Sequence, residues 1–295
     1  MNRFMKFSAL VFACLLAVSC GLPDLAAPTQ TPVPSATHTP VPPTPTLTPT
    51  TTPVPTGPCD NPLMSLDIGN QWRYLAASPL GSSEQVLRVV EWDERYGINA
   101  IIEMEDLETG TIDRDWVTCL EGGGIEDFPL FFISLQLGGY LDGVLNTYYD
   151  SGIYAPPYLE FAENNWLLDW DAVYVTEEGA CFRGVVENIN ICIGVNTVID
   201  LVFETRGEYE PVTVPAGTFP HALKVAFSYS MVTTLVYPTL TTSGRLTVHT
   251  TQWYEPYIGL VRSQVDSAGI SLTPGQESAA PVESVVELIE YTVAP

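Results

Sequence analysis

Basic residues are scarce in this chain of 295 residues. From residue 59 onward it has nine Lys and Arg against 34 Asp and Glu, a net charge of −25, and its only lysine there is Lys224. Such a charge repels the phosphates of nucleic acids and the surfaces of anionic lipids. The composition therefore argues against nucleic acid as a partner, and it is typical of a domain kept soluble outside the cell.

Recognisable catalytic motifs are also lacking. Beyond residue 58 there are two histidines, His221 and His249, and no His-Glu-x-x-His pair, Gly-x-Ser-x-Gly elbow or phosphate-binding glycine loop. Paired aspartates such as Asp113 with Asp115 arise by chance among so many carboxylates, and no calcium-binding loop surrounds them. We therefore predict a protein that is not an enzyme and that uses no cofactor or metal.

The first 19 residues have the pattern of an export signal. Arg3 and Lys6 precede an apolar stretch from Ser8 to Val18, which is too short for a typical membrane-spanning helix. Ala17-Val18-Ser19 then leads to Cys20 and resembles the recognition box of bacterial lipoprotein signals. The resemblance implies acylation of Cys20 and attachment to the cell membrane, facing outside the cytoplasm. The alternative is an ordinary secretory signal in which Cys20 is incidental.

Residues 20–58 are expected to form the lipid anchor and a disordered linker. Pro and Thr make up 23 of the 38 residues from 21 to 58. Such a segment cannot bury a core and favours an extended polyproline II conformation, so it could reach roughly 100 Å. Its Thr-Pro pairs could carry O-linked glycans, and the simpler alternative is an inert tether.

Alternating apolar residues dominate residues 59–295. In the segment from Leu223 to Met231, every second residue is large and apolar, and small or polar residues lie between them. This pattern predicts a strand with one buried face, preceded by a tight turn at Pro215-Ala216-Gly217. Further strands are expected at 86–92, 98–104, 111–120, 199–204, 244–254 and 285–293. We predict a mainly β fold with antiparallel strands and little helix, either as one domain or as two similar halves that divide near 150–165.

Four cysteines remain in this region. An even number in an exported chain indicates two disulfides, and four cysteines allow three pairings. We favour Cys59 with Cys119 and Cys181 with Cys192, because the second pair brackets an apolar hairpin. A zinc site is the alternative, but the chain has no Cys-x-x-Cys knuckle.

The stretch from Phe128 to Leu145 is nearly uncharged. Asp142 is its one charged residue, and Gly138-Gly139 interrupts the apolar run. We predict two buried strands around a Gly-Gly turn. The alternative is an apolar flap over a cavity.

Several short motifs occur in a fixed order along the chain. They are Leu63 followed by Gly69-Asn70-x-Trp72-x-Tyr74, Trp116-x-x-Cys119, Ala155-Pro156-Pro157 with Trp166, Val212 to Phe219, and Trp253-Tyr254 with Leu260-Val261. Together they resemble a group of uncharacterised bacterial exported lipoproteins that share a Val-Pro-Ala-Gly-Thr-Phe turn and a Trp-Tyr…Gly-Leu-Val strand. The resemblance implies an antiparallel sheet, strongly curved or forming a half-barrel similar to LolA/LolB. The group has no established reaction, so it supplies no catalytic residues.

Two binding functions are compatible with this pattern. The hollow side of a curved sheet would hold an apolar or amphiphilic ligand, such as a lipid. The expected lining residues are Phe131, Phe132, Leu135, Phe227 and Tyr229. Alternatively, exposed aromatic residues would bind a glycan or an envelope protein, as in a display or adhesion module. The simplest reading of the same aromatic residues is that they fill the core.

Overall fold

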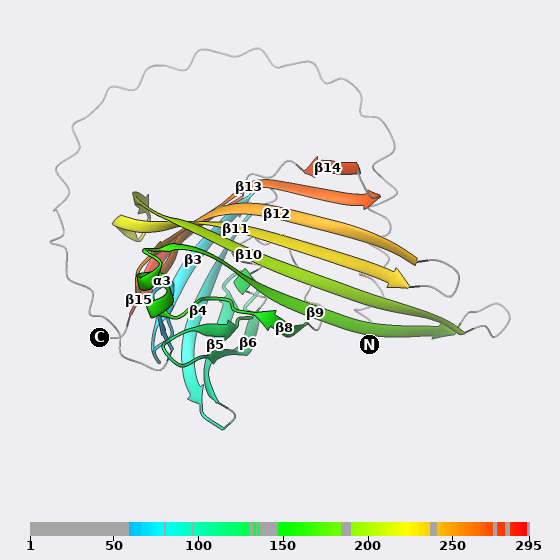
Figure 1. Cartoon of the computed structure of the whole chain (residues 1–295), viewed down its shortest axis with the longest axis horizontal. Coiled ribbons are helices and arrows are strands. Elements are labelled where there is room, and N and C mark those ends of the chain that lie inside the picture. Colours follow the sequence, from blue (N-terminus) through cyan, green and yellow to red (C-terminus); the bar gives the residue numbers. More distant parts are fainter. Residues whose placement is uncertain are drawn as a thin grey trace, which may run out of the picture. The chain divides into compact units, whose positions relative to one another are not determined.

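The structure is a computed structural model that describes residues 59–79, 81–95, 97–129, 132–133, 135, 147–183, 190–236, 241–273, 276–280 and 284–293. Within this part the chain forms a 13-stranded sheet, with a separate pair of β1 (Asp60–Asn61) and β2 (Met64–Ser65) (Figure 1). Neighbouring strands of the sheet are antiparallel. The predicted fold class, mainly β and antiparallel with little helix, is confirmed.

The first half of the sheet is a meander of short strands. It consists of β3 (Gln71–Ser78), β4 (Gly81–Asp93), β5 (Ile98–Asp106), β6 (Ile112–Cys119) and β7 (Ile125–Asp127). On β3, Trp72 and Tyr74 are fully buried, as their spacing of two residues predicts for one strand face. The Trp72 indole N–H donates to the Ile258 carbonyl, and the Tyr74 hydroxyl donates to the Leu260 carbonyl at 3.1 Å. These bonds connect the first half of the sheet to the second.

The second half consists of long strands. They are β9 (Leu167–Arg183), β10 (Asn190–Val214), β11 (Gly217–Val236), β12 (Thr241–Glu255) and β13 (Gly259–Thr273). β10 and β11 are joined by the predicted tight turn, in which Val214 pairs with Gly217 and Gly217 takes a φ of +142°. In Figure 1 the long strands lie side by side and extend well beyond the short strands, which run at a steep angle to them.

The strand near the C-terminus joins the two halves. β15 (Val285–Thr292) pairs with β3 on one side and with β13 on the other. The order across the sheet is β7-β6-β5-β4-β3-β15-β13-β12-β11-β10-β9-β8, where β8 is Tyr148–Gly152, and β14 (Gln276–Ala280) pairs with β13 outside this path. The two meanders therefore belong to one continuous sheet.

The sheet curls until its two edges approach each other. Ile125 of β7 and Ala155, which follows β8, exchange backbone hydrogen bonds of 2.8 and 2.9 Å. The buried Asn61 side chain donates to the carbonyls of Gly123 at 2.9 Å and Pro156 at 2.8 Å, so it ties the same two edges together. The short helix α3 (Tyr158–Glu163) follows this junction. The expected strong curvature is confirmed, and it encloses one face of the sheet.

The stretch from Phe128 to Leu145 differs from the prediction. Within this stretch the structure describes residues 128–129, 132–133 and 135. The rest of the stretch lies outside the described residues. Residues 132, 133 and 135 are helical, so the prediction of buried strands is wrong for them. Phe132, Ile133 and Leu135 are all buried, so this helical segment belongs to the core. Pro129 accepts a hydrogen bond from the Phe132 N–H at 3.1 Å, and proline favours the start of a helix.

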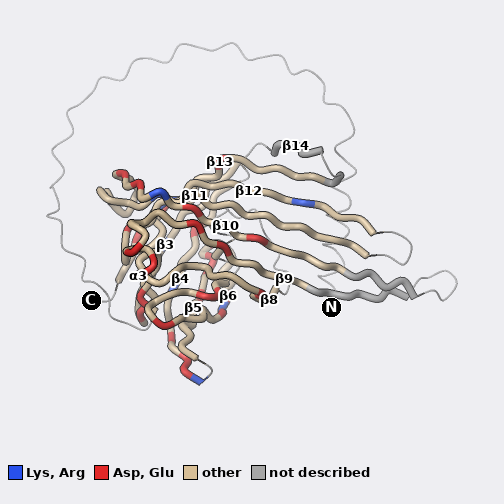
Figure 2. The backbone as a smooth tube through the Cα atoms, viewed as in Figure 1, with Lys and Arg blue, Asp and Glu red and all other residues tan. Residues whose placement is uncertain are grey.

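Charged side chains are spread unevenly over the described residues. Figure 2 shows Asp and Glu gathered over the short strands and over those ends of the long strands that lie near the short strands. The opposite ends, which extend beyond the short strands (Figure 1), are called the far ends. The far ends of β11 and β12 are almost uncharged, and Arg245 is the charged residue there. The strong negative charge of the chain is therefore concentrated away from the far ends of these two strands.

Candidate functional site

Four neighbouring rows of side chains lie on the inner face of the long strands. The inner face is the side of the sheet that carries the buried alternate residues, and the strand register places its residues opposite one another. Each row runs from β9 towards β12 or β13. The aromatic row holds Trp170, Phe203, Phe227 and Thr250, and the second row beside it holds Ala172, Leu201, Tyr229, Val248 and Ala268. The third row holds Tyr174, Ile199, Met231, Leu246 and Ile270, and the threonine row after it holds Thr176, Thr197, Thr233 and Gly244.

The aromatic row is closed on β9, β10 and β11 by its stacked rings. The rings of Trp170 and Phe203 are stacked with centroids 5.2 Å apart, and those of Phe203 and Phe227 are stacked at 4.6 Å. A cavity of about 10 Å³ remains beside them. It is lined by Leu63, Met64, Ile125, Phe132, Tyr154, Ala155, Phe203 and Tyr254. This volume is close to that of a single water-sized probe, so this end of the inner face is a filled core.

The third row becomes more exposed from β9 to β13. Tyr174 and Ile199 are buried, Met231 and Leu246 are half-buried, and 46% of Ile270 is exposed. Water therefore reaches apolar side chains of the inner face on β12 and β13. A molecule could approach the sheet interior from this side.

Three buried hydroxyls on the inner face have no hydrogen-bond partner within the part of the chain that the structure describes. They are the hydroxyls of Tyr229, Thr250 and Thr176, and each residue is at most 2% exposed. In contrast, the hydroxyls of Thr197 and Thr233 lie 3.1 Å apart and bond to each other. A buried polar group without a partner costs about 1–3 kcal/mol, so a bound water or ligand is the usual explanation.

The predicted ligand-lining residues are core residues where the structure describes them. Phe132, Leu135, Phe227 and Tyr229 are each at most 1% exposed, and Phe131 lies outside the described residues. Phe132 packs edge to face against Tyr74 at 6.2 Å and Phe128 at 5.1 Å. Phe227 and Tyr229 lie in two adjoining rows of the long strands, while Phe132 packs against the short strands. These residues therefore form the floor of the inner face rather than an open wall.

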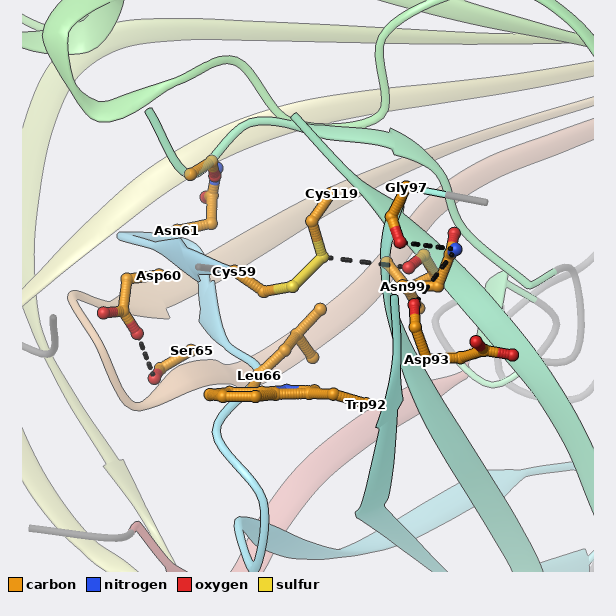
Figure 3. The surroundings of a disulfide bond; sticks show 12 residues. Cys59, Asp60, Asn61, Ser65, Leu66, Trp92, Asp93, Gly97, Asn99 and Cys119 are labelled. Carbon is orange, nitrogen blue, oxygen red and sulfur yellow. Dashed lines mark hydrogen bonds between the residues drawn. A yellow bond between two sulfur atoms is a disulfide. The ribbon is translucent and has the colours of Figure 1, made fainter. Parts of the chain in front are cut away.

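One of the two predicted disulfides is present. Cys59 and Cys119 are bonded, and they connect the segment before β1 to the end of β6 (Figure 3). Trp92 lies beside this bond, and its indole N–H donates to the Leu66 carbonyl at 3.0 Å (Figure 3).

The other two sites predicted at cysteines remain predictions. Cys181 and Cys192 are direct register partners on β9 and β10, as the hairpin prediction requires, but their side chains lie outside the described residues. Cys20, the predicted lipidation site, also lies outside them. No helix in the described residues is long and apolar enough to cross a membrane.

A pair of carboxyl groups at the junction of the sheet edges was not singled out from the sequence. Burial raises the pKa of Asp127 to about 6, although the polar Tyr174 hydroxyl beside it opposes the shift. Burial also raises the pKa of Asp115 on β6. The negative charge of ionised Asp115 in turn contributes to the raised pKa of Asp127. Only the strand register, which the sequence does not give, could have brought these two aspartates together.

The remaining polar candidates lie on the outer face of the long strands. His249 Nδ1 is 2.7 Å from the Ser228 hydroxyl, an exposed cross-strand pair on β11 and β12. Asp169, which alternates with Asp171 on β9, forms an ion pair with Arg206 at 2.9 Å. These contacts have the form of ordinary cross-strand pairs on a solvated sheet face. The absence of enzymatic activity stays a prediction.

Comparisons with known proteins show limited likeness. No family model matches the chain, and no curated protein matches it. Among solved structures, a candidate lipoprotein from Parabacteroides distasonis is similar at 17% identity and a TM-score of 0.44, with 79% of this chain and 99% of that chain covered. A candidate exported protein with a YmcC-like fold from Bacteroides fragilis is similar at 17% identity and a TM-score of 0.39, over 79% of this chain and 97% of that one. Neither result confirms the expected similarity to LolA/LolB, which stays a prediction.

Proposed function

We propose that the chain is an exported lipoprotein, held at the cell membrane through Cys20, whose β-sheet domain binds an amphiphilic ligand on the inner face of β9 to β13. The anchor follows from the signal pattern and the Pro/Thr-rich linker. The observation that carries the binding proposal is the third row, which runs from buried Ile199 to exposed Ile270 along one apolar face. An apolar surface that continues from solvent into a core is suited to an acyl chain.

The side chains of the third row favour entry of such a chain. Met231 is half-buried, unbranched and flexible, so it can shift to admit a hydrocarbon segment without disturbing the strands. Leu246 lies next to it in the same row, and Ile270 lies next to Leu246. The rings of Trp170, Phe203 and Phe227 in the aromatic row are stacked on one another, so these rings would end the site on the side of β9 to β11.

The alternative, a glycan- or protein-binding module, has less support. Such a module would be expected to present a flat row of aromatic rings. The exposed aromatic side chains of the described residues instead lie on five different elements. They are Trp116, Tyr148, Tyr158, Tyr209 and Tyr291.

The binding proposal is tested with a fluorescent acyl probe titrated into the exported chain carrying Cys20→Ala, purified without detergent. We expect saturable binding that Leu246→Asp weakens about tenfold or more, because the new charge would be buried against the chain of the ligand. Thr247→Asp is the matched control, since Thr247 is the next residue of β12 and points to the opposite face. If no saturable binding occurs, or if both variants weaken it equally, the proposal is wrong.

A further inference from the structure

The polar groups of the inner face lie deeper than its accessible apolar groups. Tyr229 and Thr250 are diagonal neighbours on β11 and β12, because Tyr229 pairs with Val248 and Phe227 pairs with Thr250. Tyr229 is also diagonal to Leu246 of the third row, which pairs with the exposed Ile270. A continuous series of neighbours therefore leads from the rim of the sheet at Ile270 to two buried hydroxyls.

These two hydroxyls are suited to an oxygen or hydroxyl group of a ligand. Neither has a hydrogen-bond partner within the described residues, although both are buried. A hydroxyl can donate one hydrogen bond and accept others, so each of the two can serve either an alcohol or a carbonyl oxygen. Burial raises the pKa of Tyr229, which keeps its hydroxyl protonated and available as a donor.

The surroundings of these hydroxyls disfavour a charged group. None of the residues of the four rows carries a formal charge, so no cation in the rows could pair with a buried anion. The ionisable side chains that the structure places beside Tyr174 of the third row are Asp127 and Tyr149, and neither is a cation. A carboxylate or phosphate moved to this depth would lose its water without gaining a counter-charge.

We infer that the ligand is an uncharged amphiphile, such as a long-chain alcohol or an acyl ester, whose polar group is bound by the hydroxyls of Tyr229 and Thr250. This inference rests on the proposed function, and it adds the chemical class of the ligand and the residues that recognise its polar end. The polar end enters first, and the hydrocarbon chain lies along the third row towards Ile270.

A displacement experiment tests the class of ligand. A fluorescent acyl probe bound to the Cys20→Ala chain is displaced by a long-chain alcohol, by the fatty acid of equal length and by the methyl ester of that acid, at about pH 8, where the acid is ionised. We expect the alcohol and the ester to displace the probe at concentrations about tenfold or more below that of the fatty acid. If the fatty acid is as effective as the neutral compounds, the inferred ligand class is wrong while the proposed function stands. If the probe itself never binds, the proposed function fails.

Variants test the two hydroxyls separately from the fold. Tyr229→Phe and Thr250→Val remove each hydroxyl with little change in shape, and we expect each to weaken binding of the alcohol several-fold and to leave a pure hydrocarbon probe unaffected. Ser230→Ala is the matched control, because Ser230 follows Tyr229 on β11 and its side chain lies on the opposite face. Unchanged binding of the alcohol by both hydroxyl variants would overturn the assignment of these residues.

Discussion

The aromatic row and the third row lie on the same inner face, only two rows apart, yet they differ in how they are filled. In the aromatic row, Trp170, Phe203 and Phe227 are stacked on one another, and the cavity beside them has a volume of about 10 Å³. In the third row, exposure rises from buried Ile199 to Ile270, which is 46% exposed. Strand register alone sets these residues side by side, so one continuous sheet serves both as core and as candidate binding surface.

This difference has a physical cause in the surrounding elements. The Phe132 side chain and the junction at Ile125 and Ala155 wall the cavity beside Phe203 and its aromatic neighbours. The far ends of the long strands extend beyond the short strands (Figure 1). The stacked rings of the aromatic row are therefore expected to determine stability, and the third row, together with the hydroxyls of Tyr229 and Thr250, to determine binding.

The largest expected effect is on stability at the aromatic row. Phe227→Ala should reduce the free energy of unfolding by about 3–5 kcal/mol, because it removes a fully buried ring and leaves a cavity. Met231→Ala should cost roughly half of that or less, because Met231 is only half-buried. Urea unfolding followed by far-UV circular dichroism measures both. Equal costs for the two variants would contradict the proposed difference between the rows.

The disulfide provides a second way to separate the determinants of stability from those of ligand binding. Cys59 and Cys119 are 60 residues apart, so replacing both by Ser should cost about 4 kcal/mol in the chain-entropy account of disulfides. Thermal or urea unfolding measures this loss against the unmodified chain. Because the bond lies near the filled end, we expect the folded variant to bind the acyl probe normally. A loss of binding by the folded variant would show that the filled end of the inner face and the third row are coupled.

The next effect concerns pH and the junction of the sheet edges. The folded-state pKa of Asp127 is about 6, above its ordinary value of 3.8, so the folded state holds this proton more tightly than the unfolded state. Stability from this group is therefore present below about pH 4 and is lost as pH rises to about 6. Asp115 on β6, Glu126 on β7, and Tyr149 and Tyr174 from the opposite edge are the titratable groups near it.

Asp127→Asn should remove this pH dependence. Above about pH 6 we expect the variant to melt roughly 2–4 °C higher than the unmodified chain, an estimate kept small because Asp127 is partly exposed to solvent. Below about pH 4 the two proteins should melt alike. Differential scanning calorimetry across this range decides the matter, and a constant difference at every pH would show that Asp127 acts by packing instead.

The smallest expected effect compares two buried tyrosines. Tyr74 donates to the Leu260 carbonyl at 3.1 Å, whereas the Tyr229 hydroxyl has no partner within the described residues. Without ligand, Tyr74→Phe should cost about 1 kcal/mol and Tyr229→Phe should be neutral or slightly stabilising. Urea unfolding of both variants measures this difference, and a cost for Tyr229→Phe equal to that of Tyr74→Phe would mean that Tyr229 is already satisfied.

Much of the fold could be predicted because strand alternation is a local property. The alternation from Leu223 to Met231 identified β11, and the turn at Pro215 to Gly217 identified its start. The prediction was wrong for residues 132, 133 and 135, because a short apolar run fits either a strand or a buried helix. There Pro129, which accepts a hydrogen bond from the Phe132 N–H, favours the start of a helix.

The candidate site could be predicted only in part. Phe227 and Tyr229 were recognised as inner-face residues, since alternation assigns a face to each residue of a strand. Alternation does not say which residues of other strands lie beside them, so Leu246, Ile270 and Thr250 were missed. Their positions depend on the pairing of β11, β12 and β13, including two register shifts between β12 and β13.

Native mass spectrometry tests the central claim most directly. The Cys20→Ala chain would be exported from a bacterial host, purified without detergent, and measured before and after extraction with organic solvent. The account predicts an added mass in near-stoichiometric amount that is released by extraction, identified as an uncharged lipid, and reduced in Leu246→Asp but not in Thr247→Asp. A protein that carries no such mass and takes up no acyl probe would contradict it.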